Sequence, residues 1–116
     1  MKDNIIQQKS YSFAIRIVGL ARWLRARKEH DLSSQVLRAG TGIGSNVEEA
    51  LAAISRPDFV AKMGIASKEA RESHYWLRLL RDAGIVPARQ IDQLVGESLE
   101  LVRILTSIVK TTQASK

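Results

Sequence analysis

Residues 91–108 read IDQLVGESLELVRILTSI. The apolar positions of this stretch recur at alternating steps of three and four residues. They are Ile91, Leu94, Ser98, Leu101, Leu105 and Ile108, with Ser98 as the one polar member. An α-helix turns once in about 3.6 residues, so such steps keep the side chains on a single face. The stretch therefore predicts an amphipathic helix that buries one face.

Three earlier segments repeat this spacing. The first holds Phe13, Ile17, Leu20 and Leu24. The second holds Leu32, Val36, Ala39, Ile43, Val47, Ala50 and Ile54. The third holds Phe59, Met63, Ala66, Ala70, Ser73, Leu77 and Leu80. Four apolar faces of this kind, on consecutive segments, predict an all-α fold in which the helices cover one another's faces.

Helix boundaries follow from the residues between these segments. Pro57 and Pro87 suit the first turn of a helix, and Gly84 can take the left-handed conformation that ends one. Ser55 is expected to cap the third helix, and Asp31 or Ser33 the second. We expect helices over residues 5–28, 32–54, 57–82 and 87–112 of one domain spanning 1–116. Short connections between long helices favour an antiparallel up-and-down four-helix bundle.

Composition limits the classes of protein to consider. The chain has 116 residues, of which 45% are apolar and only 5% aromatic, so one aliphatic core is expected. It has no cysteine, which excludes disulfides, thiolate metal sites and a cysteine nucleophile. Neither a signal peptide nor a membrane span is indicated, and we expect a cytoplasmic protein.

Positive charge is concentrated in the first quarter of the chain. The net charge is +6, and residues 1–30 contain seven basic side chains against two acidic ones. Such a distribution favours association with a polyanion such as RNA. The residues expected to bind nucleic acid are Arg16, Arg22, Arg25, Arg27 and Lys28. The same charges at the end of a helix also complement its dipole, and the two roles are compatible.

Polar residues lie beside the apolar faces of the second and third helices. If these helices form a hairpin around residues 55–57, positions whose numbers sum to about 112 face each other, so Arg38 faces Glu72 and Ser73. The expected polar network consists of Gln35, Arg38, Asn46, Glu49, Glu69 and Glu72. Two interpretations remain open: an ion-pair network that fixes the register of the helices, or a groove for RNA or a protein partner.

Two tryptophans stand off the main apolar faces. Trp23 and Trp76 belong to a second apolar flank, which is typical of either a wide core or contact with another subunit. Tryptophan is enriched at the energetic centres of interfaces. Both are therefore predicted to lie in an oligomer interface, with extra core as the alternative.

No catalytic, metal or cofactor site is predicted. The glycine run at 40–44 lacks the sixth-position glycine of a dinucleotide fingerprint and the Gly-Lys-Ser/Thr of a P-loop. Gly40 and Gly44 are better explained by close approach of another helix. A di-metal bundle site needs Glu-x-x-His, but arginines stand three residues before His30 and His74. Ser73 and His74 are adjacent on a helix and point apart, which excludes a serine triad. We expect neither enzymatic activity nor a small-molecule substrate.

Two motifs carry a resemblance to a known family. The first is Arg-Ala-x-x-x-Ile-x-x-Asn-x-x-Glu at 38–49, and the second is Lys-Glu-Ala-Arg-Glu-x-x-Tyr-Trp-Leu at 68–77. With these motifs the chain resembles the bacterial four-helix-bundle proteins named for the intervening sequences of 23S rRNA genes. It departs from them at Gly42, where serine is common, and at Ala50, where glycine is common.

The resemblance implies an up-down bundle that assembles into a homopentamer. Such an assembly is similar to the accessory variability protein of diversity-generating retroelements, a protein that works with a reverse transcriptase and its RNA. We therefore expect a non-catalytic scaffold whose basic surface associates with RNA or with a nucleic-acid enzyme such as a reverse transcriptase. The alternative is a protein-protein adaptor that does not bind nucleic acid.

Overall fold

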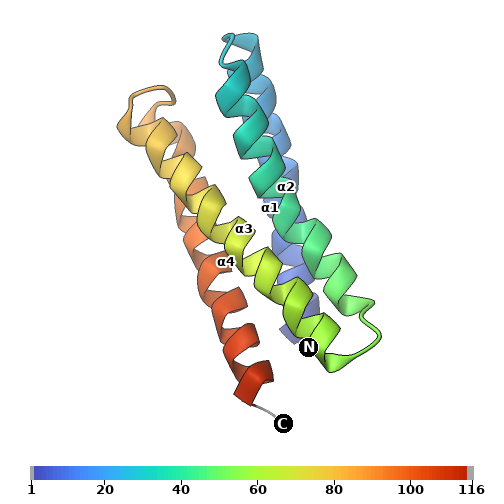
Figure 1. Ribbon diagram of the computed structural model, residues 1–116. Helices are drawn as coiled ribbons and strands as arrows, with labels where there is room; N and C mark the ends of the chain where they lie inside the picture. The colour runs from blue at the N-terminus through green and yellow to red at the C-terminus, as the bar shows by residue number, and fades with distance from the viewer. Residues whose placement is uncertain (1, 115–116) are drawn as a thin grey trace.

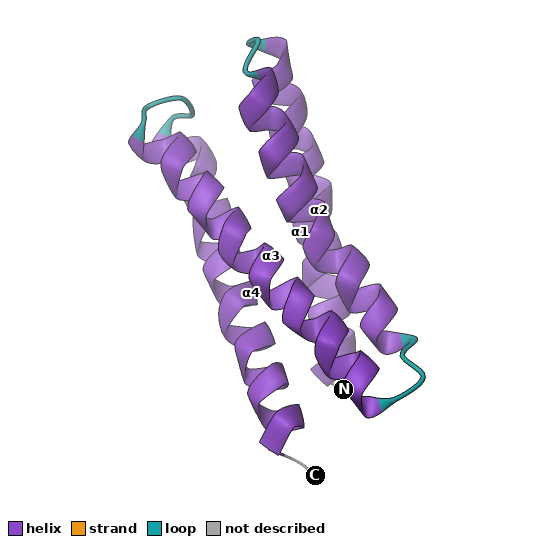
Figure 2. Ribbon diagram, in the orientation of Figure 1, coloured by secondary structure: helices purple, strands orange, loops and turns teal. Residues whose placement is uncertain are grey.

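The protein is a bundle of four α-helices in a computed structural model that describes residues 2–114 (Figures 1 and 2). The helices are α1 (Lys2–Ala26), α2 (His30–Leu51), α3 (Arg56–Asp82) and α4 (Ala88–Ala114). The predicted all-α four-helix bundle is confirmed, and each helix begins and ends within three residues of its predicted bounds. Residues 1, 115 and 116 of the predicted domain lie outside the described part.

The core is built from the four predicted apolar faces. The fully buried large side chains include Phe13 and Ile17 of α1, Ile43 of α2 and Leu77 of α3. Burying one such side chain stabilises a fold by about 1.5–3 kcal/mol, so these faces dominate the stability of the bundle. The serines among them are also buried. The hydroxyl of Ser98 donates to the carbonyl of Val95 at 2.7 Å, so its burial leaves no unpaired donor.

Neighbouring helices in the chain are neighbours in space. α1 packs on α2, α2 on α3 and α3 on α4, whereas α1 and α4 make the least extensive of the helix contacts. α1 and α3 therefore lie at diagonal corners of a bundle 48 Å long and 20 Å wide. The α1–α2 and α3–α4 turns lie at one end of the bundle, and the α2–α3 turn lies at the other (Figure 1).

Two of the predicted helix ends are confirmed. The hydroxyl of Ser55 accepts a hydrogen bond from the Asp58 amide at 3.2 Å and caps α3. Gly84 has a φ of 73°, and the amide of Ile85 donates to the carbonyl of Leu80 at 3.0 Å. A left-handed glycine followed by this bond is a common way to end an α-helix.

Two local predictions were wrong. Ile54 was placed on the apolar face of α2, but that helix ends at Leu51 and the Ile54 side chain is 96% exposed in the turn. Neither Asp31 nor Ser33 caps α2, whose N-cap is Glu29. Ser33 lies one turn inside α2 and is buried, and its hydroxyl donates to the Ala21 carbonyl of α1 at 2.8 Å. It connects the two helices instead.

The glycines of α2 allow α1 to approach closely. A Cβ at Gly40 would lie 2.7 Å from the Cγ1 and Cγ2 atoms of Ile17, and one at Gly44 would lie 3.4 Å from the Ser10 carbonyl oxygen. Real Cβ contacts as short as the first do not occur without displacement of the neighbour. The predicted close approach of a helix at Gly40 and Gly44 is confirmed.

Lys28 has a left-handed backbone conformation, with a φ of 66°. The Glu29 amide donates to the Leu24 carbonyl at 3.0 Å, so α1 ends with the same motif as α3 but without glycine. We expect Lys28→Gly to raise the free energy of unfolding by about 0.5–1 kcal/mol, because glycine takes this conformation without strain. Urea unfolding checks this. Lys28→Ala removes the same charge but keeps the strain, and an equal gain in that variant would contradict the explanation.

Candidate nucleic-acid interface

Four basic side chains gather at the end of α1 and in the turn that follows. Arg22, Arg25, Arg27 and Lys28 are all exposed. They occupy the last turn and a half of the helix and its end, where helix geometry brings residues three apart onto neighbouring positions of the surface. We call this group the α1 basic cluster.

The α1 basic cluster has no carboxylate within ion-pair distance among the side chains that the structure describes, those of residues 5–114. Glu29 and Asp31 follow it closely in the chain but pair with none of its members. Elsewhere on the bundle five basic side chains do form ion pairs: Lys9, Arg16, Arg38, Lys62 and Arg81. The charge of the cluster is thus not neutralised locally, and it remains available to an anion.

Within the cluster, Arg27 is fixed against an aromatic ring. Its guanidinium carbon lies 3.6 Å from the centre of the Trp23 ring, and its Nη1 donates to the Trp23 carbonyl at 3.2 Å. A guanidinium over an indole is attracted by the negative face of the ring. The contact orders a side chain that would otherwise lose rotamer freedom on binding a phosphate.

Arg16, the fifth predicted nucleic-acid-binding residue, lies apart from the cluster. It is two turns earlier on α1 and forms an ion pair with Glu97 of α4. Two helical turns further toward the N-terminus, Lys9 pairs with Glu100 at 3.4 Å. The two ion pairs bridge α1 and α4, which pack less extensively than the other contacting helix pairs. The structure therefore gives Arg16 a role in joining helices.

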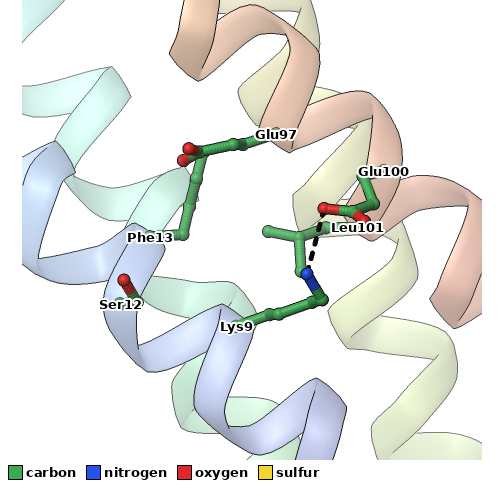
Figure 3. A pocket seen from close by; sticks show the side chains of 6 residues that line it. All are labelled: Lys9, Ser12, Phe13, Glu97, Glu100 and Leu101. Carbon is green, nitrogen blue, oxygen red and sulfur yellow. Dashed lines mark hydrogen bonds and ion pairs between the residues drawn. The ribbon is translucent and has the colours of Figure 1, made fainter.

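A small pocket lies beside these ion pairs (Figure 3). It has a volume of about 140 Å³ and is lined by Lys9, Ser12, Phe13, Glu97, Glu100 and Leu101. Phe13 and Leu101 are its apolar lining residues, and its polar groups are Ser12 and three charged side chains. All three of these charged side chains take part in ion pairs, Lys9 with Glu100 and Glu97 with Arg16.

Four of the six predicted network residues form one connected group. Arg38 donates to Gln35 at 3.0 Å, forms a hydrogen-bonded ion pair with Glu72 and lies 3.5 Å from Glu69. The Trp76 indole N–H donates to Glu72 at 3.0 Å. The indole first, and then Arg38, hold the pKa of Glu72 below its ordinary value although burial opposes them, so this carboxylate is charged at neutral pH.

The other two predicted network residues lie outside that group. The Asn46 side chain donates to the Gly42 carbonyl of its own helix at 2.8 Å. Glu49 pairs with Lys62 of α3 at 2.9 Å. Lys62 was not predicted to belong to the network. The numbers of Glu49 and Lys62 nevertheless sum to about 112, as expected for facing positions of the α2–α3 hairpin, so this ion pair could have been predicted from the sequence.

Groups of three or more potential metal ligands do not occur among the described residues. In the same part of the chain, none of the helices combines the length and the apolar character that a membrane crossing requires. His74 is half-buried, and its burial, followed by the charges of Arg78 and Arg81, lowers its pKa. It is therefore neutral near pH 7.

Comparison with known proteins identifies the family. A family model described as 23S rRNA-intervening sequence protein matches residues 2–107. The chain belongs to this family. A crystal structure of a protein of unknown function from the S23 ribosomal protein family of Bacteroides thetaiotaomicron VPI-5482 is 43% identical, with a TM-score of 0.89. The alignment covers 95% of this chain and 99% of that one. No curated protein matches the chain.

Gly42 of α2 lies beside a carboxylate of α3. A Cβ at Gly42 would lie 3.1 Å from the carboxylate carbon of Glu69. The glycine leaves room for this carboxylate beside α2, where it can approach Arg38.

The two tryptophans of this family member pack partly against the bundle core. Trp23 is covered by Arg27, and Trp76 is held by Glu72. More exposed apolar side chains lie elsewhere: Tyr11 and Ile15 of α1 are 66% and 57% exposed, and Tyr75 of α3 is 50% exposed. The interface role of the tryptophans stays a prediction, and these exposed side chains are further candidates for an interface.

Proposed function

We propose that the chain is a non-catalytic scaffold that assembles into a homopentamer and binds RNA, alone or together with a nucleic-acid enzyme such as a reverse transcriptase. The observation that carries the proposal is the α1 basic cluster, with four exposed cations that have no carboxylate partner among the described side chains of residues 5–114. The family description names an intervening sequence of 23S rRNA.

The mechanism is electrostatic. Lysine and arginine side chains that neutralise phosphates release the counterions condensed on the nucleic acid, and this release favours binding. Arg27, held over Trp23, contributes a preordered guanidinium. Such contacts set affinity and position but read no base sequence. The scaffold therefore binds RNA by its charge and shape, with little dependence on sequence.

Filter binding of a structured RNA at low and raised salt tests the proposal. We expect binding at low salt that weakens steeply as salt increases, because counterion release makes the logarithm of the binding constant fall linearly with that of the salt concentration. Absence of binding at low salt defeats the nucleic-acid part of the proposal. In that event the adaptor alternative, a protein-protein module, takes its place.

Self-assembly is supported by apolar side chains exposed on two diagonal helices. Tyr11 and Ile15 are one turn apart on α1, and Tyr75 and Leu79 are one turn apart on α3, with Leu79 38% exposed. Since α1 and α3 lie at diagonal corners, these pairs face different directions. Two different patches on one molecule favour a head-to-tail contact, which closes into a ring when the rotation between copies allows it. The number five comes from the family resemblance.

Ile15→Glu is expected to reduce the oligomeric mass, because it places a charge in the α1 patch while leaving the core of each copy intact. Light scattering measures the mass, and circular dichroism checks that the helices persist. Ile54→Glu is the matched control, because Ile54 is even more exposed but lies in the α2–α3 turn. A wild-type monomer, or an unchanged mass in Ile15→Glu, would contradict the α1 patch as an interface.

A further inference from the structure

A second basic region lies in the groove between α3 and α4, far from the α1 basic cluster in the fold. The polar residues that line the groove are Arg71, Arg103, Thr106, Ser107, Lys110 and Thr111. Arg71 comes from α3, and the others come from the second half of α4. Three cations and three hydroxyl groups thus surround one depression, and every one of them can donate a hydrogen bond to a phosphate oxygen.

The three cations of this groove are free of carboxylates. Arg71 donates to the Thr106 hydroxyl at 3.2 Å, and this hydrogen bond holds the Arg71 side chain at the groove. Within residues 5–114, neither Arg71 nor Arg103 nor Lys110 takes part in an ion pair. Glu100, one turn before Arg103, is instead paired with Lys9 at 3.4 Å. The groove therefore holds positive charge that the fold does not neutralise.

The shape of the groove favours a chain of phosphates over a single one. Arg103 and Lys110 are seven residues apart on α4, which corresponds to about 10 Å along the axis at roughly 1.5 Å per residue. The hydroxyls of Thr106 and Ser107 lie between them. Cations spaced along a line suit successive phosphates of a strand, whereas one phosphate is best held by a compact cluster.

A membrane surface fits the groove less well. Peripheral membrane binding combines basic side chains with apolar ones that enter the lipid. Val102, the apolar residue that lines the groove, is buried, and the exposed Ile5 lies in an adjoining depression that shares Arg103 and Ser107 with the groove. The other side chains that line the groove itself are hydrogen-bond donors and cations, which match a phosphodiester backbone.

We infer that the α3–α4 groove is a second RNA-binding site, which holds the phosphodiester backbone of a single strand. The inference rests on the proposed function and adds a second contact surface to it. The groove lies in the half of α4 near the α2–α3 turn, whereas the α1 basic cluster lies at the opposite end of the 48 Å bundle. Because the two sites share no residues, their contributions to binding should add.

The test compares two variants that remove the same charge. The groove variant carries Arg71→Gln, Arg103→Gln and Lys110→Gln. The control carries Arg56→Gln, Arg78→Gln and Arg89→Gln, three exposed cations that are also outside the ion pairs. Binding of a labelled oligouridylate is measured by filter binding over a range of salt concentrations, and circular dichroism verifies the fold of each protein.

We expect the groove variant to lose about two units of salt slope, and up to about 100-fold of affinity near 0.1 M salt, since each single-strand phosphate contact contributes about 0.7 to the slope. The control variant should stay much closer to wild type. Equal losses in the two variants would overturn the groove as a site while leaving the proposed function intact. A wild-type protein that binds neither the oligouridylate nor the structured RNA at low salt would overturn both the groove as a site and the proposed function.

Discussion

Gly40→Ala should lower the free energy of unfolding by about 1–3 kcal/mol, although alanine is the better helix former. The added methyl group would lie 2.7 Å from two side-chain carbons of Ile17 and 3.1 Å from its Cβ. Ile17 cannot easily move away, because it is fully buried and because branching at Cβ restricts its χ1 rotation. Relief therefore requires α1 and α2 to move apart, which loosens the core along their contact.

Gly64→Ala is the matched control for this prediction. Gly64 is also inside a helix, but a Cβ there would meet no atom within 4 Å. Replacing it should therefore stabilise the protein by about 0.5–1 kcal/mol, the gain in helix propensity alone. Urea unfolding of both variants measures the two changes. If Gly40→Ala were as stable as Gly64→Ala, the packing explanation for the glycine in α2 would be wrong.

The fold could be predicted from the sequence because burial follows the helical period. Phe13, Ile17, Leu20 and Leu24 were selected by spacing alone, and all four are buried. The prediction for Ile54 was wrong because apolar spacing does not indicate where a helix ends. The spacing continues through position 54, whereas α2 ends at Leu51. A side chain beyond the end of its helix no longer points to the helical face.

Contacts across the α2–α3 hairpin could be predicted because a short turn fixes the register of two helices. Arg38 and Glu72 met as the rule of opposite positions required. No such rule joins α1 to α4, which are separated by the whole length of the hairpin between them. The Arg16–Glu97 ion pair, between residues 81 positions apart, was therefore missed, and Arg16 was assigned to the basic surface. Sequence charge counts cannot distinguish a paired arginine from a free one.

The same limitation explains why the α3–α4 groove was missed. Arg71, Arg103 and Lys110 are spread over two helices in which basic side chains outnumber acidic ones by two or are balanced by them, whereas the larger excess at residues 1–30 attracted attention to α1. What distinguishes these three side chains from other unpaired cations is that they line one depression, and that depends on how α3 lies against α4. Local charge density predicted one basic site and could not predict the other.

Removing the α1 basic cluster should have the largest effect on RNA binding. The variant with Arg22→Gln, Arg25→Gln, Arg27→Gln and Lys28→Gln is expected to lose about three units of salt slope, since each phosphate contact contributes about 0.7–0.9. Near 0.1 M salt this corresponds to a loss of roughly 1,000-fold in affinity. Filter binding of a structured RNA over a salt series measures both quantities, and circular dichroism is needed because Arg27 also packs on Trp23.

A control of equal charge separates a site from a general attraction. Changing Arg56, Lys68, Arg78 and Arg89 to Gln removes four exposed cations outside the ion pairs and outside both proposed sites. A long-range field depends on net charge and would weaken equally in the two variants, whereas direct contacts with phosphates are lost only where the cations touch them. Equal salt slopes in both variants would therefore refute the α1 basic cluster as an RNA-binding site, even if the wild-type protein binds RNA.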